Sequence, residues 1–513
     1  MSSSAAWSPA ESLAPRGALD ALVAEATRRA ERLRRPVVVS LTSRVRPRDP
    51  LSAFAAAAEA DRALWLRPEA GESLVGLGAA HVLRASGPDR FARLADAWRN
   101  LLGDALIEDQ AGLPSSGPLL LGGFAFDPLR PSSAAWAAFG DAHLVLPGSS
   151  LAQRDGAAWL TRNVLVGPRN PAADEHPERH TDPPKASHKT DGKRLQRHTE
   201  GRKASHQADG KRLQRHTHEP EASHEIDGKR LQRHTDPRTA SHGTLPSADD
   251  WQALVGSVVA GIRDGSLGVD KVVLARAEQL ILDRRVDEAC LRRLVRDYPT
   301  CTVFAVARGA ACFLGATPER LAQVHHGSVR TMALAGSIGR GATPAEDRAL
   351  GDQLLASPKE RAEHGVVVRA IRDGLAEVCT SVVGPAEPRL VRLPNVQHLL
   401  TPLRAELSPG RGLFDVAAAL HPSPAVGGSP RDRALAVIRE REGLDRGWYG
   451  GLVGWVNAAG EGELGVGIRS ALLRGTEAWL YAGCGIVADS DPAAERAESE
   501  WKLRPMRSAL AGD

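Results

Sequence analysis

The stretch GGLVGWVNAAGEGELGVGIRSALLR, residues 450–474, has the pattern of two strands joined by a turn. It contains two runs of apolar and glycine residues separated by the short turn AAGE at residues 458–461. Apolar runs on both sides of a glycine-containing turn are typical of an antiparallel β-hairpin. We therefore expect one strand on each side of the turn, with the second, GELGVGIRSALLR, extending to Arg474.

Further strand-like segments precede this hairpin. VVLARAEQLIL, CTVFAVA and CFLGATP lie within residues 272–318, and PVVVSLTS, RALWLRP, PLLLGGFAFDP, HLVLPG and AAWLTRNVLV lie within residues 36–167. Helical patterns at about 51–60, 88–102 and 247–264 occur between them. Because strand pairs and hairpins dominate and helices are inserted among them, we predict an α+β fold with mainly antiparallel sheets rather than a doubly wound one.

An 18-residue tandem repeat interrupts these patterns. ASH recurs at Ala186, Ala204, Ala222 and Ala240, and GKRLQRHT occurs three times. Each unit has a single large apolar residue, too little to offset the entropy of ordering, so we predict a disordered surface insertion. Lys, Arg and His could instead bind nucleic acid or metal, but the unit lacks aromatic residues for stacking. The predicted parts are a helical or flexible segment at 1–35, an N-terminal part of the fold at 36–167, the insertion at 168–246 and a catalytic region at 247–513.

Composition favours a cytoplasmic protein. The 513 residues are 42% hydrophobic, carry a formal net charge of +4 and include five cysteines with no C-x-x-C spacing. Neither a disulfide framework nor a zinc knuckle is therefore indicated. The N-terminus has no continuous apolar region like that of a signal peptide, and no apolar run is long enough to cross a bilayer.

Two residues are candidates for acid–base chemistry. Lys271 opens the apolar run VVLA, where a lysine that loses hydration could serve as a base. Glu319 follows Thr317 and Pro318 at the end of a short strand, where a shielded carboxyl could keep its proton and act as an acid. The alternatives are a surface lysine at a strand edge and a capped turn.

Two predicted helices supply similarly spaced carboxylates. Ser357 and Pro358 resemble a helix start, and a second helix begins at Ser490, Asp491 and Pro492. Carboxylates from two helices are the hard oxygen ligands that Mg²⁺ prefers, although solvated helix faces show the same spacing. The aligned residues are Glu360 and Glu363 on the first helix, and Glu495, Glu498 and Lys502 on the second.

Anion-binding candidates lie in two apolar strands. Arg469 interrupts GELGVGIRSALL, and a buried guanidinium needs an anionic partner, either a substrate carboxylate or a structural carboxylate. In YAGCGIV, Gly483 and Gly485 would let backbone N–H groups approach a carboxylate. His398 lies in an apolar setting, where most histidines are core residues.

In this order, the segments resemble the chorismate-utilising enzymes, which include isochorismate, salicylate, anthranilate and aminodeoxychorismate synthases. The likeness is dense from Asp270 to Lys502. It is closest to isochorismate synthases, particularly the menaquinone-pathway type. Lys271 implies that water is the nucleophile, and HPSPAVGG carries Ala425 where salicylate synthases tend to have threonine. ALAGS at residues 333–337 fits the same branch.

The resemblance implies a role for each candidate. Lys271 would activate water for attack at C2 of chorismate, and Glu319 would protonate the departing C4 hydroxyl. The implied ligands of a Mg²⁺ cofactor are Glu363 and Glu498, supported by Glu360 and Glu495. The implied substrate-binding residues are His398, Ala425, Tyr449, Arg469, Gly483, Gly485 and Lys502.

The resemblance also implies the anthranilate synthase component I-like fold, conversion of chorismate to isochorismate for menaquinone synthesis, and a monomer. Partners would not include nucleic acid, membrane or a glutamine amidotransferase subunit. The enzyme alternatives are a salicylate synthase or an isochorismate synthase of a siderophore pathway. A non-enzyme alternative is a metal- or nucleic-acid-binding protein that acts through the histidine-rich repeats.

Overall fold

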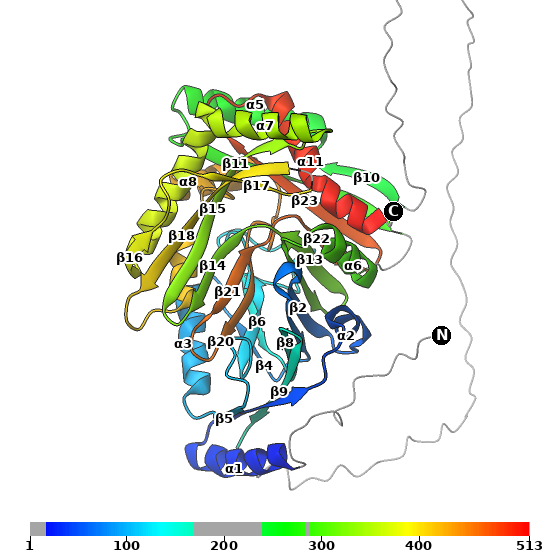
Figure 1. The fold of residues 1–513 in the computed structure, drawn as a ribbon, viewed down its shortest axis with the longest axis vertical. Helices are drawn as coiled ribbons and strands as arrows, with labels where there is room; N and C mark the ends of the chain where they lie inside the picture. The colour runs from blue at the N-terminus through cyan, green and yellow to red at the C-terminus, as the bar shows by residue number, and fades with distance from the viewer. Residues whose placement is uncertain (1–16, 169–238, 283–286, 395, 512–513) are drawn as a thin grey trace, which may run out of the picture. The chain divides into compact units, whose positions relative to one another are not determined.

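The computed structural model describes residues 17–168, 239–282, 287–394 and 396–511. They belong to one compact unit with two large β-sheets and helices packed on them (Figure 1). Among the described strands, β1 with β5 is the parallel pair, and the other pairings are antiparallel. The predicted α+β class with mainly antiparallel sheets is confirmed.

The larger sheet has 13 described strands, with β19 pairing β11 beside the main path. In spatial order they are β10 (Thr239–Leu245), β11 (Lys271–Leu282), β23 (Glu477–Ile486), β22 (Ser470–Arg474), β13 (Ala311–Thr317), β12 (Thr302–Arg308), β2 (Asp61–Arg67), β3 (Glu72–Leu77), β8 (Ser149–Arg154), β9 (Ala157–Val166), β1 (Val37–Val45) and β5 (Leu106–Asp109), with β19 at Gly428–Ser429.

The second sheet has ten described strands, with β17 (Arg389–Arg392) pairing β18 beside the main path. In spatial order they are β16 (Cys379–Val383), β18 (Val396–Leu407), β15 (Ser328–Gly339), β14 (Arg320–His325), β21 (Gly462–Val466), β20 (Leu452–Asn457), β6 (Leu119–Phe124), β7 (Ala142–Leu146) and β4 (His81–Arg84). Because β2 pairs β12 and β6 pairs β20, segments from before and after the repeats build the same sheets.

Helices pack on both sheets. Three of these contacts matter below: α8 packs on β15, α11 packs on β23 and α10 packs on β11. The described helices are α1 (Ala18–Leu33), α2 (Pro50–Ala56), η2 (Pro68–Ala70), α3 (Arg90–Leu102), α5 (Ala248–Arg263), α6 (Asp287–Asp297), α7 (Pro344–Ala356), α8 (Pro358–Ala376), α9 (Leu413–Leu420), α10 (Arg431–Arg441) and α11 (Pro492–Ala511).

Aromatic rings fill a buried cluster to which both sheets contribute. The rings of Trp136 and Phe313 lie 5.2 Å apart, and those of Phe139 and Trp448 lie 5.0 Å apart. Large buried rings of this kind dominate core energetics. They fix the loop that carries Trp448, next to the candidate Tyr449.

The hairpin expected at residues 450–474 is present, but its second strand differs from the prediction. β20 pairs β21 as expected, whereas the run to Arg474 is two strands in different sheets, β21 in the smaller and β22 in the larger. The chain turns at residues 467–469, where Arg469 has a left-handed φ of 51°. An unbroken strand is excluded because this φ is incompatible with extended backbone.

The segment formed by β13 and β14 also passes from the larger sheet to the smaller one, next to β22 and β21. β13 pairs β22 in the larger sheet, and its continuation β14 pairs β21 in the smaller. Backbone hydrogen bonds from Val466 to Glu319 (3.0 Å) and from Ala316 to Arg469 (3.1 Å) link the two crossings. The four strands therefore form one two-stranded ribbon that bends at Glu319 and Arg469.

The predicted repeat insertion, 168–246, lies almost wholly outside the described residues. Its last part is described, and Thr239–Leu245 form β10, which pairs antiparallel with β11. Strand pairing therefore orders the end of the predicted insertion, which includes the last copy of ASH at residues 240–242.

Among the described residues, no helix combines the length and the apolar character needed to span a bilayer.

Gly454 in β20 provides a test of the sheet packing. Its φ is 154°, and an added Cβ would lie 2.0 Å from the backbone oxygen of Glu463 on β21. We expect Gly454→Ala to lower the free energy of unfolding by about 3 kcal/mol. Urea unfolding would measure this change.

Gly475 is the matched control because its φ is also positive, at 62°, but an added Cβ meets nothing within 4 Å. Gly475→Ala should cost only about 1 kcal/mol. Equal losses for the two variants would contradict the backbone contact at Gly454.

Candidate active site

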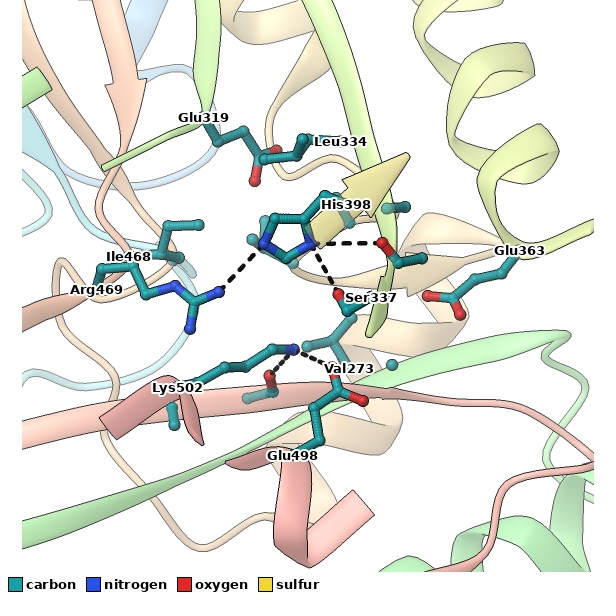
Figure 2. Close-up of a pocket in the computed structure, with 18 of the residues that line it drawn as sticks. Val273, Glu319, Leu334, Ser337, Glu363, His398, Ile468, Arg469, Glu498 and Lys502 are labelled. Carbon is teal, nitrogen blue, oxygen red and sulfur yellow. Dashed lines mark hydrogen bonds and ion pairs between the residues drawn. The ribbon is translucent and has the colours of Figure 1, made fainter. Parts of the chain in front are cut away.

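All the candidate residues from the sequence line one cavity between the two sheets, α8 and α11; Figure 2 labels Glu319, Glu363, His398, Arg469, Glu498 and Lys502 among them. The volume of the cavity is about 940 Å³, open mouth included. The sequence-predicted residues around it are Lys271, Glu319, Glu360, Glu363, His398, Ala425, Tyr449, Arg469, Gly483, Gly485, Glu495, Glu498 and Lys502. These residues come from nine separate elements or connecting segments, although the chain separates the first and the last by more than 200 positions.

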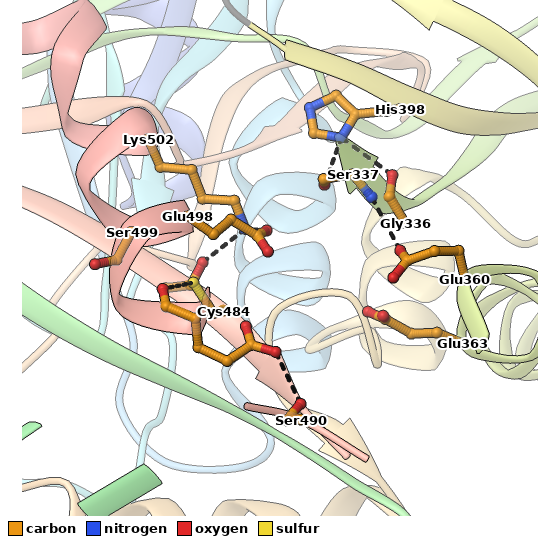
Figure 3. A network of polar contacts seen from close by, with 12 residues as sticks. Gly336, Ser337, Glu360, Glu363, His398, Cys484, Ser490, Glu498, Ser499 and Lys502 are labelled. Atoms are coloured by element: carbon orange, nitrogen blue, oxygen red, sulfur yellow. Dashed lines mark hydrogen bonds and ion pairs between the residues drawn. The ribbon is translucent and has the colours of Figure 1, made fainter. Parts of the chain in front are cut away.

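The predicted start of α8 explains how its carboxylates are aimed. Ser357 is the N-cap and its side chain accepts from the backbone N–H of Glu360 at 3.3 Å, with Pro358 in the first turn. One carboxylate oxygen of Glu360 accepts from the backbone N–H of Ser337 at 3.2 Å. Figure 3 shows the Glu360 and Glu363 carboxylates facing, across the cavity, the carboxylate of Glu498.

Two lysine–glutamate pairs lie in the cavity, one between β11 and α8 and one within α11. Lys271 Nζ lies 2.6 Å from Glu363 Oε1, and Lys502 Nζ lies 2.6 Å from Glu498 Oε1. Lys502 also donates to the backbone oxygen of Gly483 at 2.9 Å. Burial opposes charge on the Lys502 ammonium, but the nearby Glu498 carboxylate outweighs it and raises the pKa of Lys502.

The glycines of β23 leave room for these side chains. A Cβ on Gly485 would lie 2.6 Å from Lys271 Cε and 2.8 Å from Glu363 Oε1. A Cβ on Gly483 would lie 3.0 Å from the Tyr449 hydroxyl. A side chain at position 485 would therefore displace the Lys271–Glu363 pair, a reason for glycine that sequence analysis did not supply.

The remaining carboxylates suit a divalent cation. Burial and then the charge of Glu363 raise the pKa of Glu360, and burial and then Glu498 raise the pKa of Glu495 to about 7. A divalent cation would relieve such crowding of like charge, and carboxylate oxygens are the donors that Mg²⁺ takes. Carboxylate oxygens of Glu495 and Glu498 and the sulfur of Cys484 lie within 4.8 Å of one another. Burial raises the pKa of the Cys484 thiol well above its ordinary value, so the hard donors here are the carboxylates.

Glu319 occupies the bend of the ribbon and is buried, with 6% of its surface exposed. Burial raises the pKa of its carboxyl to about 7, against the opposing charges of Lys271, Lys502 and Arg469. Its backbone N–H donates to Thr317 Oγ1 at 3.2 Å. Near neutral pH a large share of Glu319 therefore carries a proton and can donate it.

Arg469 is held by His398 and offers one free end. Its Nη2 lies 3.4 Å from His398 Nε2, whereas its Nη1 is buried without a hydrogen-bond partner among the described residues. A guanidinium only donates, so His398 Nε2 must be the acceptor and the ring proton must lie on Nδ1. His398 Nδ1, which carries this proton, lies 2.8 Å from Ser337 Oγ (Figure 2). Burial, aided by the charge of Arg469, lowers the pKa of His398 well below its ordinary value, consistent with a neutral ring.

Sequence reasoning missed other lining residues. They include Val273, Leu334, Lys359, Val426, Arg446 and Ile468. Arg446 could have been noticed, because it lies four residues after Glu442 and three before Tyr449 in REGLDRGWYG. The apolar residues carry no signal that distinguishes a pocket wall from a core.

Comparisons with known proteins identify the family of this chain. The family described as "Chorismate binding enzyme" matches residues 24–217 and 202–511. This protein belongs to that family, and the recognition made from its motifs is confirmed.

Two curated relatives extend over nearly the whole chain. The "Salicylate biosynthesis isochorismate synthase" of Pseudomonas aeruginosa is 36% identical over 94% of this chain and 92% of its own length. The "Isochorismate synthase MenF" of Bacillus subtilis is 33% identical over 96% of this chain and 97% of its own length. The solved structure of the menaquinone-specific isochorismate synthase MenF of Escherichia coli has the same fold, with a TM-score of 0.68, 24% identity and coverage of 96% and 99%. Anthranilate synthase component I of Streptococcus pneumoniae shares it at a TM-score of 0.59, with 20% identity and coverage of 85% and 92%.

The raised pKa of Glu319 predicts how stability depends on pH. Between the ordinary value of 4.5 and about 7, the folded protein keeps a proton that the unfolded chain has lost. This carboxyl therefore favours the folded state at low pH, and its contribution is lost as pH rises through 7. As pH rises from about 4 to about 8, the free energy of unfolding of the Glu319→Gln variant should increase, relative to that of the parent, by about 3 kcal/mol.

Urea unfolding of both proteins across this range measures the difference, with Glu406→Gln on an exposed position of β18 as control. A difference between Glu319→Gln and the parent that stays constant with pH would show that Glu319 has an ordinary pKa.

Proposed function

We propose that this protein is an isochorismate synthase, an isomerase that converts chorismate to isochorismate. The observation that carries the proposal is that one cavity holds a buried lysine, a carboxyl that keeps its proton near neutral pH, and a guanidinium with a free end. The family and the names of the two relatives that extend over nearly the whole chain support it.

In the proposed reaction, Lys271 in its unprotonated form takes a proton from water, which attacks C2 of chorismate. Glu319 donates its proton to the C4 hydroxyl, the C4–O bond breaks, and the ring double bonds shift between these carbons. One water enters and one leaves, so the product is an isomer. A proton must then pass from Lys271 to Glu319 before the next turnover.

The other residues would bind and orient the substrate. Arg469, with its free Nη1, would pair with the enolpyruvyl carboxylate beside Tyr449 and the backbone of Gly483 and Gly485. Lys502 would lie near the ring carboxylate, and the neutral ring of His398 would orient Arg469 and line the ring pocket beside Ala425.

We propose Mg²⁺ as the cofactor. The crowded carboxylates fit it, with Glu363 and Glu498 as ligands and Glu360 and Glu495 in support. Bound there, the cation would neutralise the ring carboxylate of chorismate.

We propose menaquinone synthesis as the pathway, and a monomer without an amidotransferase subunit. The relatedness to the Bacillus subtilis MenF protein supports the pathway. The 36% identity to a salicylate-biosynthesis isochorismate synthase favours a second candidate, the same reaction in a salicylate or siderophore pathway.

Incubating the purified protein with chorismate tests the reaction. We expect isochorismate to form with Mg²⁺ and to be lost with a chelator, and chromatography would identify the product. Salicylate with pyruvate would assign the protein to the lyases of this family. Unchanged chorismate in the presence of Mg²⁺ would contradict the proposed function.

Lys271→Ala tests the base. Removing a general base typically costs about 10²- to 10⁴-fold in rate, so kcat should fall by at least about 100-fold while the protein stays folded. Arg404→Ala, at an exposed cation on β18, is the control and should keep the parent rate. A Lys271→Ala protein that retains the parent kcat would exclude this lysine as the base.

A further inference from the structure

Glu442 and Arg446 form a buried ion pair beside the cavity. Glu442 follows the last turn of α10, and Arg446 lies four residues later; their side chains are 0% and 3% exposed. Arg446 Nε donates to Glu442 Oε1 at 2.7 Å, and Nη2 donates to Oε2 of the same carboxylate. The guanidinium also lies 4.3 Å from the centre of the Phe126 ring.

This pair holds the backbone of two segments that carry candidate residues. Arg446 Nη2 donates to Val273 O at 2.6 Å, and Nη1 donates to Val426 O at 3.0 Å. Glu442 Oε2 accepts from the backbone N–H of Ala275 at 2.7 Å. Val273 lies two positions after Lys271 on β11, and Val426 follows Ala425.

A third segment is tied to the same residue. The backbone N–H of Tyr449 donates to Arg446 O at 2.8 Å. The pair therefore joins the strand of Lys271, the segment of Ala425 and the loop of Tyr449, which approach one wall of the cavity from three parts of the chain.

The two arginines of the cavity differ in how many of their N–H groups already have hydrogen-bond acceptors. Four of the five N–H groups of Arg446 already have protein acceptors, and Glu442 balances its charge. Arg469 instead has a buried Nη1 without a partner among the described residues. A substrate carboxylate would thus bind Arg469 and leave Arg446 in place.

We propose that Glu442 and Arg446 form a positioning pair that sets the place of Lys271 relative to bound substrate. A buried ion pair often adds little stability over apolar residues of similar size, so stability alone does not account for it. The inference rests on the proposed function for its kinetic effect, but its structural effect can be measured without turnover.

The first variant is Arg446→Lys, which keeps the charge beside Glu442 but cannot reach Val273 O and Val426 O together. Because a small misplacement of a catalytic group is costly, kcat should fall at least roughly tenfold. Because the pair also holds the segments of Ala425 and Tyr449, KM should rise, but by less than kcat falls, since the anchors Arg469 and Lys502 are held by other segments. Amide hydrogen exchange should quicken in residues 271–277 and 422–428 and stay at the parent rate elsewhere.

The second variant is Glu442→Leu with Arg446→Met, which replaces the pair by apolar side chains. Apolar packing offsets the lost ion pair, but the backbone groups of Ala275, Val273 and Val426 lose these partners, so thermal stability should fall and kcat should stay low. The matched control is Asp127→Asn with Arg439→Gln, which removes an ion pair of the same helix α10 that does not line the cavity. This control should keep kcat and local exchange within about twofold of the parent.

Several outcomes would overturn the positioning role. One is an Arg446→Lys variant with the kcat and the amide exchange rates of the parent. Another is a Glu442→Leu, Arg446→Met variant with the stability and the kcat of the parent. The third is amide exchange that becomes faster throughout the protein in the Arg446→Lys variant. If the parent does not convert chorismate, the proposed function fails, and exchange in residues 271–277 and 422–428 still decides whether the pair positions them.

Discussion

The bend of the two-stranded ribbon between the sheets is the constraint on which the site depends. β13 and β22 lie in one sheet, and their continuations β14 and β21 lie in the other. Backbone bonds between Glu319 and Val466 and between Ala316 and Arg469 fix both crossings together. The bend therefore delivers an acid and a cation to the same cavity from backbone that both sheets hold.

Ion pairs within the protein balance most of the charge in the cavity. Lys271 pairs with Glu363 and Lys502 with Glu498, so most of the buried charge is neutralised by the protein itself. Within the part of the chain that the structure describes, Arg469 Nη1 has no hydrogen-bond partner, whereas burial and a neighbouring carboxylate raise the pKa of Glu360 and of Glu495. Such a site suits an anionic substrate together with a divalent cation.

Local sequence patterns predicted much of this structure because their signals are short-range. The hairpin at 450–474, the Ser357–Pro358 helix start and the spacing of the glutamates each depend on neighbouring residues. The split of the second hairpin strand could not be predicted, because a non-glycine residue with left-handed φ inside an apolar run has no distinct pattern. The contacts of Arg446 with Val273 and Val426 could not be predicted, because these partners are distant in sequence. The same holds for the contact between Ser337 and His398.

The position of β10 has a consequence for the length of the connection that precedes it. β9 and β10 are nine strand spacings apart in the larger sheet, which is about 43 Å measured along the sheet. Even fully stretched, about a dozen residues are needed to cover that path. The connection, residues 167–238, has 238 − 167 + 1 = 72 residues, so the loss of one 18-residue unit would still leave more than this minimum.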